Sequence, residues 1–242
     1  MSGHSKWSQI KRQKGTADAK RSTLFTKLGN TITAAAREGG VNPEHNFKLR
    51  LAIERAKTIN LPNDNIERAI KRGGGELEGE ILSSVVYEGF GPGGVALVIE
   101  AITDNKNRTS SEIRSIITKY GGTFGSPKSV IWQFNHRGEI ILDFTDNAGL
   151  TPADLEAKII ESGADDFKQT PTGFEILTLP DQLKAVQEKL VALGVVCGDS
   201  SLIYQPQNTI ALKPADQKKL EDLIAELEDN QSVDTVYTNS NP

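Results

Sequence analysis

The chain has 242 residues, of which 37% are hydrophobic and 25% are charged, a composition typical of globular proteins with two or three domains. No apolar run approaches the roughly eighteen residues that would span a membrane, and the single cysteine, Cys197, excludes an internal disulfide. The start of the chain also lacks the apolar core of a secretory signal, so we expect a cytoplasmic protein without membrane contact.

The net charge of -4 conceals two oppositely charged parts. Residues 3–75 carry 15 Lys or Arg against 6 Asp or Glu, whereas residues 76–242 carry 13 against 26. The basic residues are densest near the start, where Trp7 lies among them. Because cations release phosphate counterions and an aromatic ring stacks on bases, this region is predicted to bind nucleic acid. The alternative is a solvated basic helix whose Trp packs into the protein.

Three helices are expected in this basic region. Residues 17–38 place apolar side chains at helical spacing, and Gly39-Gly40 then supplies a left-handed stop. Asn42-Pro43 has the order of a helix start, and a third helix is expected over 62–72, before a run of three glycines. These elements predict a three-helix bundle with a basic arm over residues 1–77.

A glycine-rich stretch, Gly89 to Gly94, matches the G-x-G-x-x-G pattern of dinucleotide-binding loops. In those loops the pattern opens a helix, whereas here β-rich runs flank it on both sides, over 84–88 and 95–103. The stretch therefore predicts a β-hairpin turn, and no cofactor is expected.

The segment after this hairpin is open to two interpretations. Asn105, Asn107 and Arg108 are suited either to contacts with backbone phosphates or to turn formation, since Asn bonds its own backbone. Thr109 to Glu112 then has the spacing of a capping box and predicts a helix start. A further strand is expected over 130–134.

From residue 138 the expected elements follow the order β-α-β-β-α-β, which is that of a ferredoxin-like unit. A strand at 209–212, a helix at 214–228 and a strand at 233–238 come after it. We expect these last elements to return to the sheet that begins near Ser84, because the ferredoxin-like unit is complete without them.

The predicted fold class is therefore α+β with three domains. The ferredoxin-like domain, residues 136–205, is an insertion into a middle α/β domain. That middle domain is discontinuous and consists of residues 78–135 and 206–240.

The sequence contains no recognisable catalytic or metal-binding group. His4, His45 and His136 fall in three different segments, and Cys197 lies beside two valines, which is typical of a buried thiol. We therefore expect no metal, no small-molecule substrate and no enzymatic activity.

Several motifs occur in order along nearly the whole chain: Gly3-His4-Ser5-Lys6-Trp7, Lys20-Arg21, Phe25-Thr26-Lys27, Gly39-Gly40, Asn60-Leu61-Pro62, residues 65–70, residues 87–94 and residues 104–109. Together they resemble the motifs of the YebC/PmpR family. Leu61 and Phe90 depart mildly from the family, where Met and Tyr are common. The resemblance implies the same three-domain arrangement. It also implies either a probable transcriptional regulator that binds DNA or a protein of translation, since the mitochondrial relative activates translation of cytochrome oxidase and bacterial members are linked to ribosomes stalled at proline runs.

Two nucleic-acid targets are compatible with these features. A basic arm followed by two acidic domains offers one narrow surface for a polyanion, and no helix-turn-helix with a recognition helix is evident. This favours ribosomal RNA, and hence the ribosome, over duplex DNA as the partner. A module that binds only proteins through the ferredoxin-like sheet is a third alternative.

The residues expected to contact nucleic acid are mostly basic and lie near the start of the chain. They are Lys6, Trp7, Lys11, Arg12, Lys14, Lys20, Arg21 and Lys27, assisted by Lys71 and Arg72 and by Asn105, Asn107 and Arg108.

Overall fold

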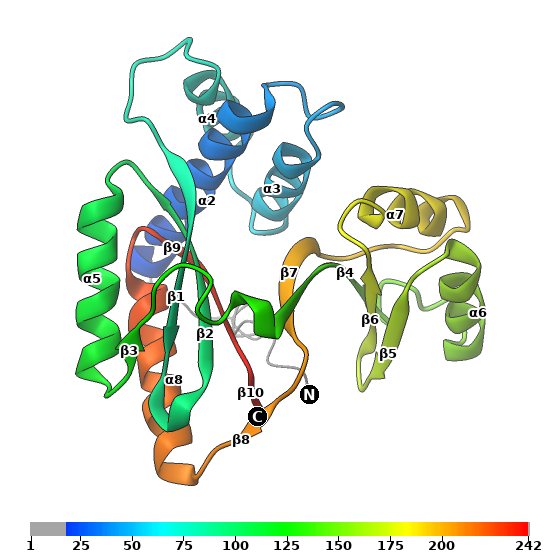
Figure 1. Ribbon diagram of the computed structural model, residues 1–242. Helices are drawn as coiled ribbons and strands as arrows, with labels where there is room; N and C mark the ends of the chain where they lie inside the picture. Colours follow the sequence, from blue (N-terminus) through cyan, green and yellow to red (C-terminus); the bar gives the residue numbers. More distant parts are fainter. Residues whose placement is uncertain (1–17, 242) are drawn as a thin grey trace. The chain divides into compact units, whose positions relative to one another are not determined.

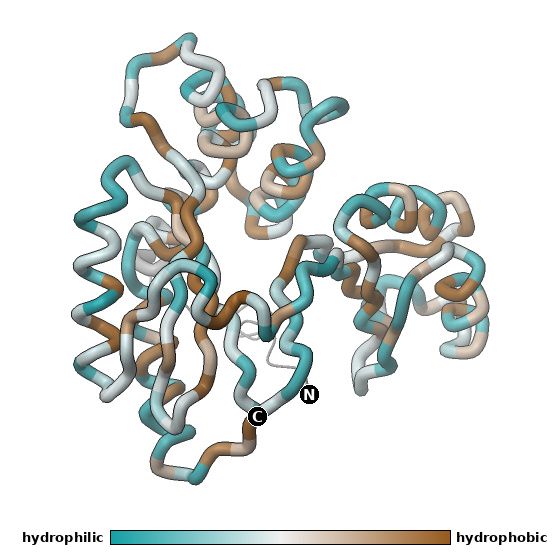
Figure 2. The backbone as a smooth tube through the Cα atoms, viewed as in Figure 1, coloured by the Kyte–Doolittle hydropathy of each residue, from teal (hydrophilic) through white to brown (hydrophobic). Residues whose placement is uncertain are grey.

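The computed structural model describes residues 18–241, with side chains from Ser22 on, and divides into two compact units (Figure 1). The smaller unit is His136–Tyr204, and the larger contains the described residues on both sides of it. Both units combine helices with antiparallel sheets, which confirms the predicted α+β class. Hydrophobic and hydrophilic residues alternate along the helical segments (Figure 2), as expected when each helix has one buried face.

Three helices form the first part of the larger unit. They are α2 (Asp18–Gly39), α3 (Phe47–Thr58) and α4 (Asn63–Gly73). Leu28, Ile32 and Leu49 are fully buried in their shared core. Because this core is separate from that of the neighbouring sheet, we propose to count the bundle as a domain of its own.

Helix α3 starts later than the sequence predicts. Asn46, and not Asn42, caps it, since its Oδ1 accepts a hydrogen bond from the Leu49 N–H at 3.1 Å. The Asn46 Nδ2 donates to the carbonyl groups of Ala35 and Gly40, each at 2.7 Å, and this fixes the turn between α2 and α3. Gly40, at φ +90°, follows the end of α2 as predicted.

The main sheet of the larger unit is antiparallel and has the order β3-β1-β2-β9. Helices α5 and α8 pack against it, and side chains such as Leu97, Ile117 and Leu223 form the buried core between helices and sheet. The elements are β1 (Ser83–Phe90), β2 (Ala96–Thr103), α5 (Lys106–Lys119), β3 (Thr123–Phe124), α8 (Pro214–Asp229) and β9 (Val233–Thr238).

The glycine-rich stretch connects β1 and β2 as a hairpin, which confirms the prediction. A single 3-10 turn, η1 (Pro92–Gly94), lies between the strands, and the N–H of Gly91 donates to the carbonyl of Val95 at 2.8 Å. Gly93 and Gly94 have φ angles of 72° and 79°, a conformation that explains why glycine occupies both positions.

Two predicted elements of this unit differ from the structure. Residues 130–134 are not a strand: a 3-10 turn, η2 (Ile131–Gln133), comes first and β4 (Phe134–Asp143) begins only after it. The strand predicted at 209–212 does not join the main sheet. It is the short β8 (Ile210–Ala211), which pairs in parallel with β10 (Ser240–Asn241), whereas β9 does return to β2.

The smaller unit has the ferredoxin-like topology that the sequence predicts. Its sheet has the order β5-β6-β4-β7, and the core contains Ile140, Leu155, Phe174, Ile176 and Leu190. Helix α6 begins with a capping box between Thr151 and Asp154. The remaining elements are α6 (Pro152–Ser162), β5 (Asp166–Thr170), β6 (Gly173–Thr178), α7 (Leu183–Ala192) and β7 (Ser200–Pro206).

One carboxyl group of the smaller unit is almost completely buried. Glu139, on β4, is 8% exposed, and burial together with the nearby carboxylates of Glu175 and Asp199 raises its pKa from 4.5 to about 8. Between these two values the folded protein retains a proton that the unfolded chain has lost. The free energy of unfolding therefore falls as the pH rises from about 4.5 to about 8, and the fall ends above the folded pKa.

Replacing Glu139 by Gln is expected to remove this pH dependence, because the amide stays neutral throughout. The wild-type smaller unit should lose about 4 kcal/mol more stability than Glu139→Gln between pH 5 and pH 8.5, as measured by urea denaturation followed by circular dichroism. Glu161→Gln, at an exposed site on α6, serves as the control and should follow the wild type. Parallel pH profiles for wild type and Glu139→Gln would contradict the assignment.

Candidate nucleic-acid interface

The predicted contact residues fall into three groups in the structure. Lys6, Trp7, Lys11, Arg12 and Lys14 lie outside the described residues, so their roles remain predictions. Lys20 and Arg21 belong to the first turns of α2, where only the backbone is described. The side chains of the remaining residues can be examined directly.

The side chain of Lys27 makes its contacts within the protein. Its ammonium group donates hydrogen bonds to the backbone carbonyls of Glu228 and Val233, the latter at 2.8 Å. The Glu228 carbonyl belongs to the last turn of α8, where the helix dipole favours a cation. Burial lowers the pKa of Lys27, although nearby carboxylates, chiefly Asp234, oppose this shift. We therefore leave Lys27 out of the proposed interface, since its charge joins α2 to the end of α8 and the start of β9.

Replacing Lys27 by Met separates these two roles. The variant should lower the free energy of unfolding of the larger unit by about 1–3 kcal/mol, because two buried carbonyls lose a charged donor. The slope of log affinity for RNA against log salt should stay unchanged. A phosphate contact at Lys27 would instead make that slope shallower by about 0.7 to 0.9. Urea denaturation and a salt titration of the same preparation measure both quantities.

An ion pair lies beside Lys27 and also joins the helices to the sheet. Arg55 of α3 contacts Asp234 of β9 at 3.2 Å, and both side chains are largely buried. Behind this pair the Tyr237 hydroxyl donates to Glu100 at 3.1 Å. Burial, and next Asp234, raise the pKa of Glu100 to about 7. The basic bundle is thus attached to the main sheet through charged groups that are already satisfied within the protein.

The end of α4 presents two of the predicted cations. Lys71 is exposed in the last turn, whereas Arg72 is half-buried, and its side-chain carbons lie against Gly79 in the acidic linker. Gly73 permits this end of α4 to approach α2 closely, because a Cβ atom there would lie only 2.5 Å from the carbonyl oxygen of Thr33. Of the two cations, Lys71 is the better placed for a phosphate contact.

The predicted loop before α5 is largely the helix cap itself. Asn105 caps α5, since its Oδ1 accepts a hydrogen bond from the Arg108 N–H at 3.1 Å. The Arg108 guanidinium contacts Asp104 at 2.6 Å and Glu112 at 3.9 Å, so its charge is largely compensated. These contacts favour the turn interpretation for both residues, while Asn107 remains exposed.

The capping box predicted at Thr109 is wrong because α5 begins at Lys106 and its cap, Asn105, lies four residues before Thr109. Thr109 is buried within the helix, where its Oγ1 lies 2.9 Å from that of Thr103. The prediction missed that Asn105 could cap the helix, which makes a second cap unnecessary.

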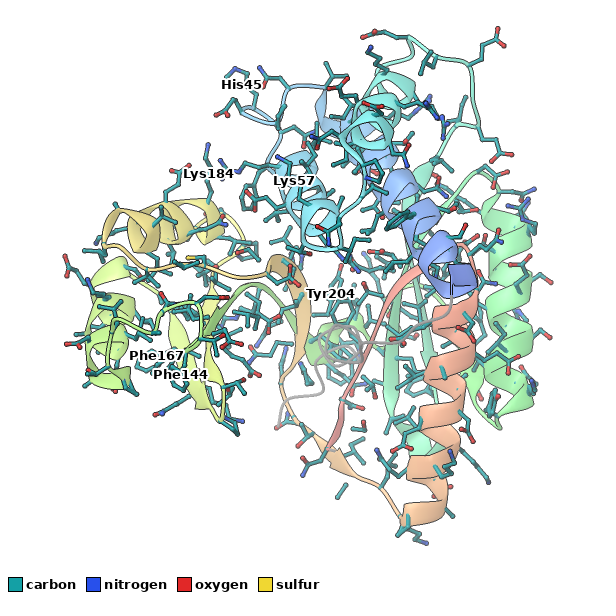
Figure 3. All side chains as sticks on the ribbon, turned by 180° about the vertical axis from the view of Figure 1, so that it is seen from behind. His45, Lys57, Phe144, Phe167, Lys184 and Tyr204 are labelled. Carbon is teal, nitrogen blue, oxygen red and sulfur yellow. The ribbon has the colours of Figure 1, made fainter. Side chains whose placement is uncertain are left out.

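Further exposed cations surround the bundle and were missing from the predicted set. They share no motif, and their exposure depends on which face each helix buries, so the sequence did not single them out. Figure 3 labels Lys57 in α3 together with His45 in the loop that precedes this helix. The exposed cations of the bundle not predicted from sequence are Arg37, Lys48, Lys57 and Arg68.

The described residues contain no cluster of His, Cys, Asp or Glu that could hold a metal ion. Cys197 is half-buried and forms no disulfide. Among residues 18–241 no helix combines the length and apolar character needed to cross a membrane.

Comparisons with known proteins cover almost the whole chain. A family model described as the TACO1/YebC protein N-terminal domain matches residues 5–76, and a second, described as the TACO1/YebC second and third domain, matches residues 82–240.

Individual relatives match over the same length. The chain is 49% identical to a "Probable transcriptional regulatory protein" of Caldanaerobacter subterraneus subsp. tengcongensis, over 99% of this chain and 98% of the relative. It is 48% identical to another protein of that description from Thermoanaerobacter pseudethanolicus, over 99% and 96%. A conserved hypothetical protein of Aquifex aeolicus has a similar crystal structure, with a TM-score of 0.87, 42% identity and coverage of 98% and 97%.

Proposed function

The chain belongs to the TACO1/YebC family, and from this premise we propose that it regulates gene expression by binding nucleic acid, without catalysing a reaction. The observation that carries this proposal is the excess of nine positive charges over residues 3–75. A field of this sign concentrates a polyanion at one part of the molecule and releases counterions from it.

In this proposal both the basic arm and the bundle contribute contacts to the nucleic acid. The arm, defined here as residues 3–21, contributes Lys6, Lys11, Arg12 and Lys14 with Lys20 and Arg21, and Trp7 supplies an aromatic ring. Exposed Lys71 extends the same positive charge to the end of α4. Lys27, Arg55 and Arg108 are excluded because contacts within the protein occupy their charges.

Ribosomal RNA is the partner that we propose. The sequence contains no evident helix-turn-helix with a recognition helix, and the acidic remainder of the chain would be repelled by an extended DNA surface. A narrow basic segment suits the irregular grooves and unpaired regions of folded RNA. The protein would then act in translation, on ribosomes in the cytoplasm.

Transcriptional regulation through duplex DNA is the second candidate. It is favoured by the printed descriptions of the relatives, which are 48% and 49% identical over nearly the whole chain. The two candidates share the same basic residues and differ in the nucleic acid that those residues prefer.

Equilibrium binding to purified nucleic acids discriminates between the two candidates. The full chain is titrated against labelled ribosomal RNA and against labelled duplex DNA of matched length, at the same salt concentration. The proposal predicts an affinity for the RNA at least about tenfold higher, which corresponds to about 1.4 kcal/mol. A tenfold preference for the duplex would support transcriptional regulation. Binding to neither nucleic acid would leave the third alternative, a module that binds only proteins.

A further inference from the structure

A single tryptophan stands out on the surface of the larger unit. Trp132, in the turn η2, is 68% exposed, whereas its neighbours Val130 and Phe134 are buried. Its indole Nε1 donates a hydrogen bond to the carbonyl of Ser129 at 3.1 Å. The protein thus satisfies the polar edge of the ring while most of its surface remains in contact with solvent.

The turn that carries Trp132 is held from beneath by a buried carboxylate. Glu88 of β1 is 5% exposed and accepts hydrogen bonds from the backbone N–H groups of Lys128, Val130 and Ile131, at 2.5, 2.7 and 2.8 Å. Lys128 itself has φ +69°, a conformation that is unusual for a residue other than glycine. A large hydrogen-bonded array therefore fixes a short segment whose one prominent feature is an exposed ring.

A second segment of the chain, which contains Gln207, contacts the other side of the turn. Gln207 donates from its backbone N–H to the Gln133 carbonyl at 2.9 Å and from its Nε2 to the Trp132 carbonyl at 3.0 Å. The Asn239 Nδ2 reaches the Gln133 side chain at 3.2 Å. These contacts fix Trp132 in place before any partner arrives, which lowers the entropic cost of binding.

The three segments that meet here have an unusual charge. Residues 125–135, 205–213 and 238–241 contain no Asp or Glu, although residues 76–242 as a whole carry 26. Their exposed side chains include two cations, Lys128 and Lys213, and many amides and hydroxyls. We call these three segments the acid-free surface. It is a region of the acidic part of the chain from which a phosphate backbone would not be repelled.

We propose that the acid-free surface binds single-stranded nucleic acid and that Trp132 stacks on one of its bases. This inference rests on the proposed function and names a second contact for the same ligand. Exposed Asn208 provides donors and acceptors for base edges, and so do the Gln207 Oε1 and the Asn135 Nδ2, which take no part in the hydrogen bond from the Gln207 Nε2 to the Asn135 Oδ1 at 3.2 Å. Lys128 provides a phosphate contact. A duplex is a poorer ligand, since its bases are already stacked on one another.

A protein partner fits this surface less well. Energetically important aromatic residues at protein interfaces lie within a ring of further contacts around an apolar centre. On the acid-free surface the only other large hydrophobic side chain that is exposed is Ile210, at 37%. The surroundings of Trp132 are otherwise amides, hydroxyls and two lysines, a mixture that favours a nucleic acid.

Tryptophan fluorescence tests the proposal directly. In a Trp7→Phe background, whose own affinity is the reference, Trp132 is the remaining tryptophan. Titration with a single-stranded oligouridine of about twelve residues should quench its emission. Adding Trp132→Ala should weaken binding about tenfold, and Trp132→Phe should recover most of that loss, because stacking needs a ring. Thermal denaturation should be unchanged, since the side chain is exposed.

The outcomes separate this inference from the proposed function. One outcome is that the reference protein binds the oligonucleotide without quenching of its Trp132 emission and loses affinity on charge reversal in the arm, while Trp132→Ala binds equally well. In that case the inference is overturned and the proposed function stands. Absence of binding to any nucleic acid would overturn both. Unchanged oligonucleotide affinity with loss of ribosome association in Trp132→Ala would identify a protein contact and overturn the inference as well.

Discussion

Reversing the charges of Lys11, Arg12 and Lys14 to Glu is expected to weaken binding to RNA at least about 100-fold near physiological salt. Each lost contact between a cation and a phosphate removes on the order of 1–1.5 kcal/mol, and the new carboxylates add repulsion. The slope of log affinity against log salt should become shallower by about 2 to 3, since three counterion-releasing contacts disappear. Fluorescence anisotropy with labelled RNA at several salt concentrations measures both quantities.

A matched control removes the effect of net charge. Lys189, Lys218 and Lys219 are exposed on α7 and α8, outside the basic region, and their reversal to Glu changes the total charge by the same amount. This control should bind RNA within about threefold of the wild type and keep its salt slope. If the two variants lost affinity equally, only the overall charge would matter and the arm would have no specific role.

Replacing Glu88 by Ala should cause the largest loss of stability of any single substitution considered. Three backbone N–H groups would lose a charged acceptor, and the group that replaced it could not reach them. Hydrogen bonds to charged groups contribute about 1.5–3 kcal/mol each, and part of this is recovered where water reaches Lys128. We therefore expect a loss of about 3–5 kcal/mol in the free energy of unfolding of the larger unit.

The same substitution should release Trp132. In the Trp7→Phe background, the fluorescence anisotropy of Trp132 should fall and its acrylamide quenching should rise, because the turn is no longer fixed. Glu221→Ala, at an exposed site on α8, is the control and should change stability by less than about 0.5 kcal/mol. A loss below about 1 kcal/mol in Glu88→Ala would show that the carboxylate does not organise this turn.

Glu88 also explains why part of the fold could not be predicted from the sequence. The apolar run at 130–134 is typical of a strand, but the carboxylate takes the N–H groups of Val130 and Ile131 that a strand would offer to a neighbour. The segment consequently forms η2 and exposes Trp132. A partner 42 residues away in the sequence leaves no local signal.

Elements with strong local signals were predicted closely. Helix α6, the first helix of the predicted ferredoxin-like unit, spans Pro152–Ser162, because Thr151 and Asp154 cap its start and Gly163, at φ +83°, ends it. The hairpin at Gly93-Gly94 was recognised for a similar reason, since the chain turns where glycine permits it. In these places the residues that determine the structure are neighbours in the sequence.

In the candidate site, too, some features follow from the local sequence and others depend on contacts between distant residues. The charge difference between the two parts of the chain is a property of composition and could be stated at once. Which individual cations remain available depends on tertiary contacts, and those of Lys27 leave no local signal because its partners, Glu228 and Val233, lie some 200 residues further on.

Sedimentation with ribosomes tests the central claim most directly. Wild type and the Lys11, Arg12, Lys14 to Glu variant are each mixed with ribosomes and excess duplex DNA at near-physiological salt and separated on a sucrose gradient. The account predicts that the wild type migrates with ribosomes despite the DNA and that the variant stays at the top of the gradient. If the DNA removes the wild type from the ribosomes, or if the variant migrates with them equally well, the proposed role of the arm in binding ribosomal RNA is contradicted.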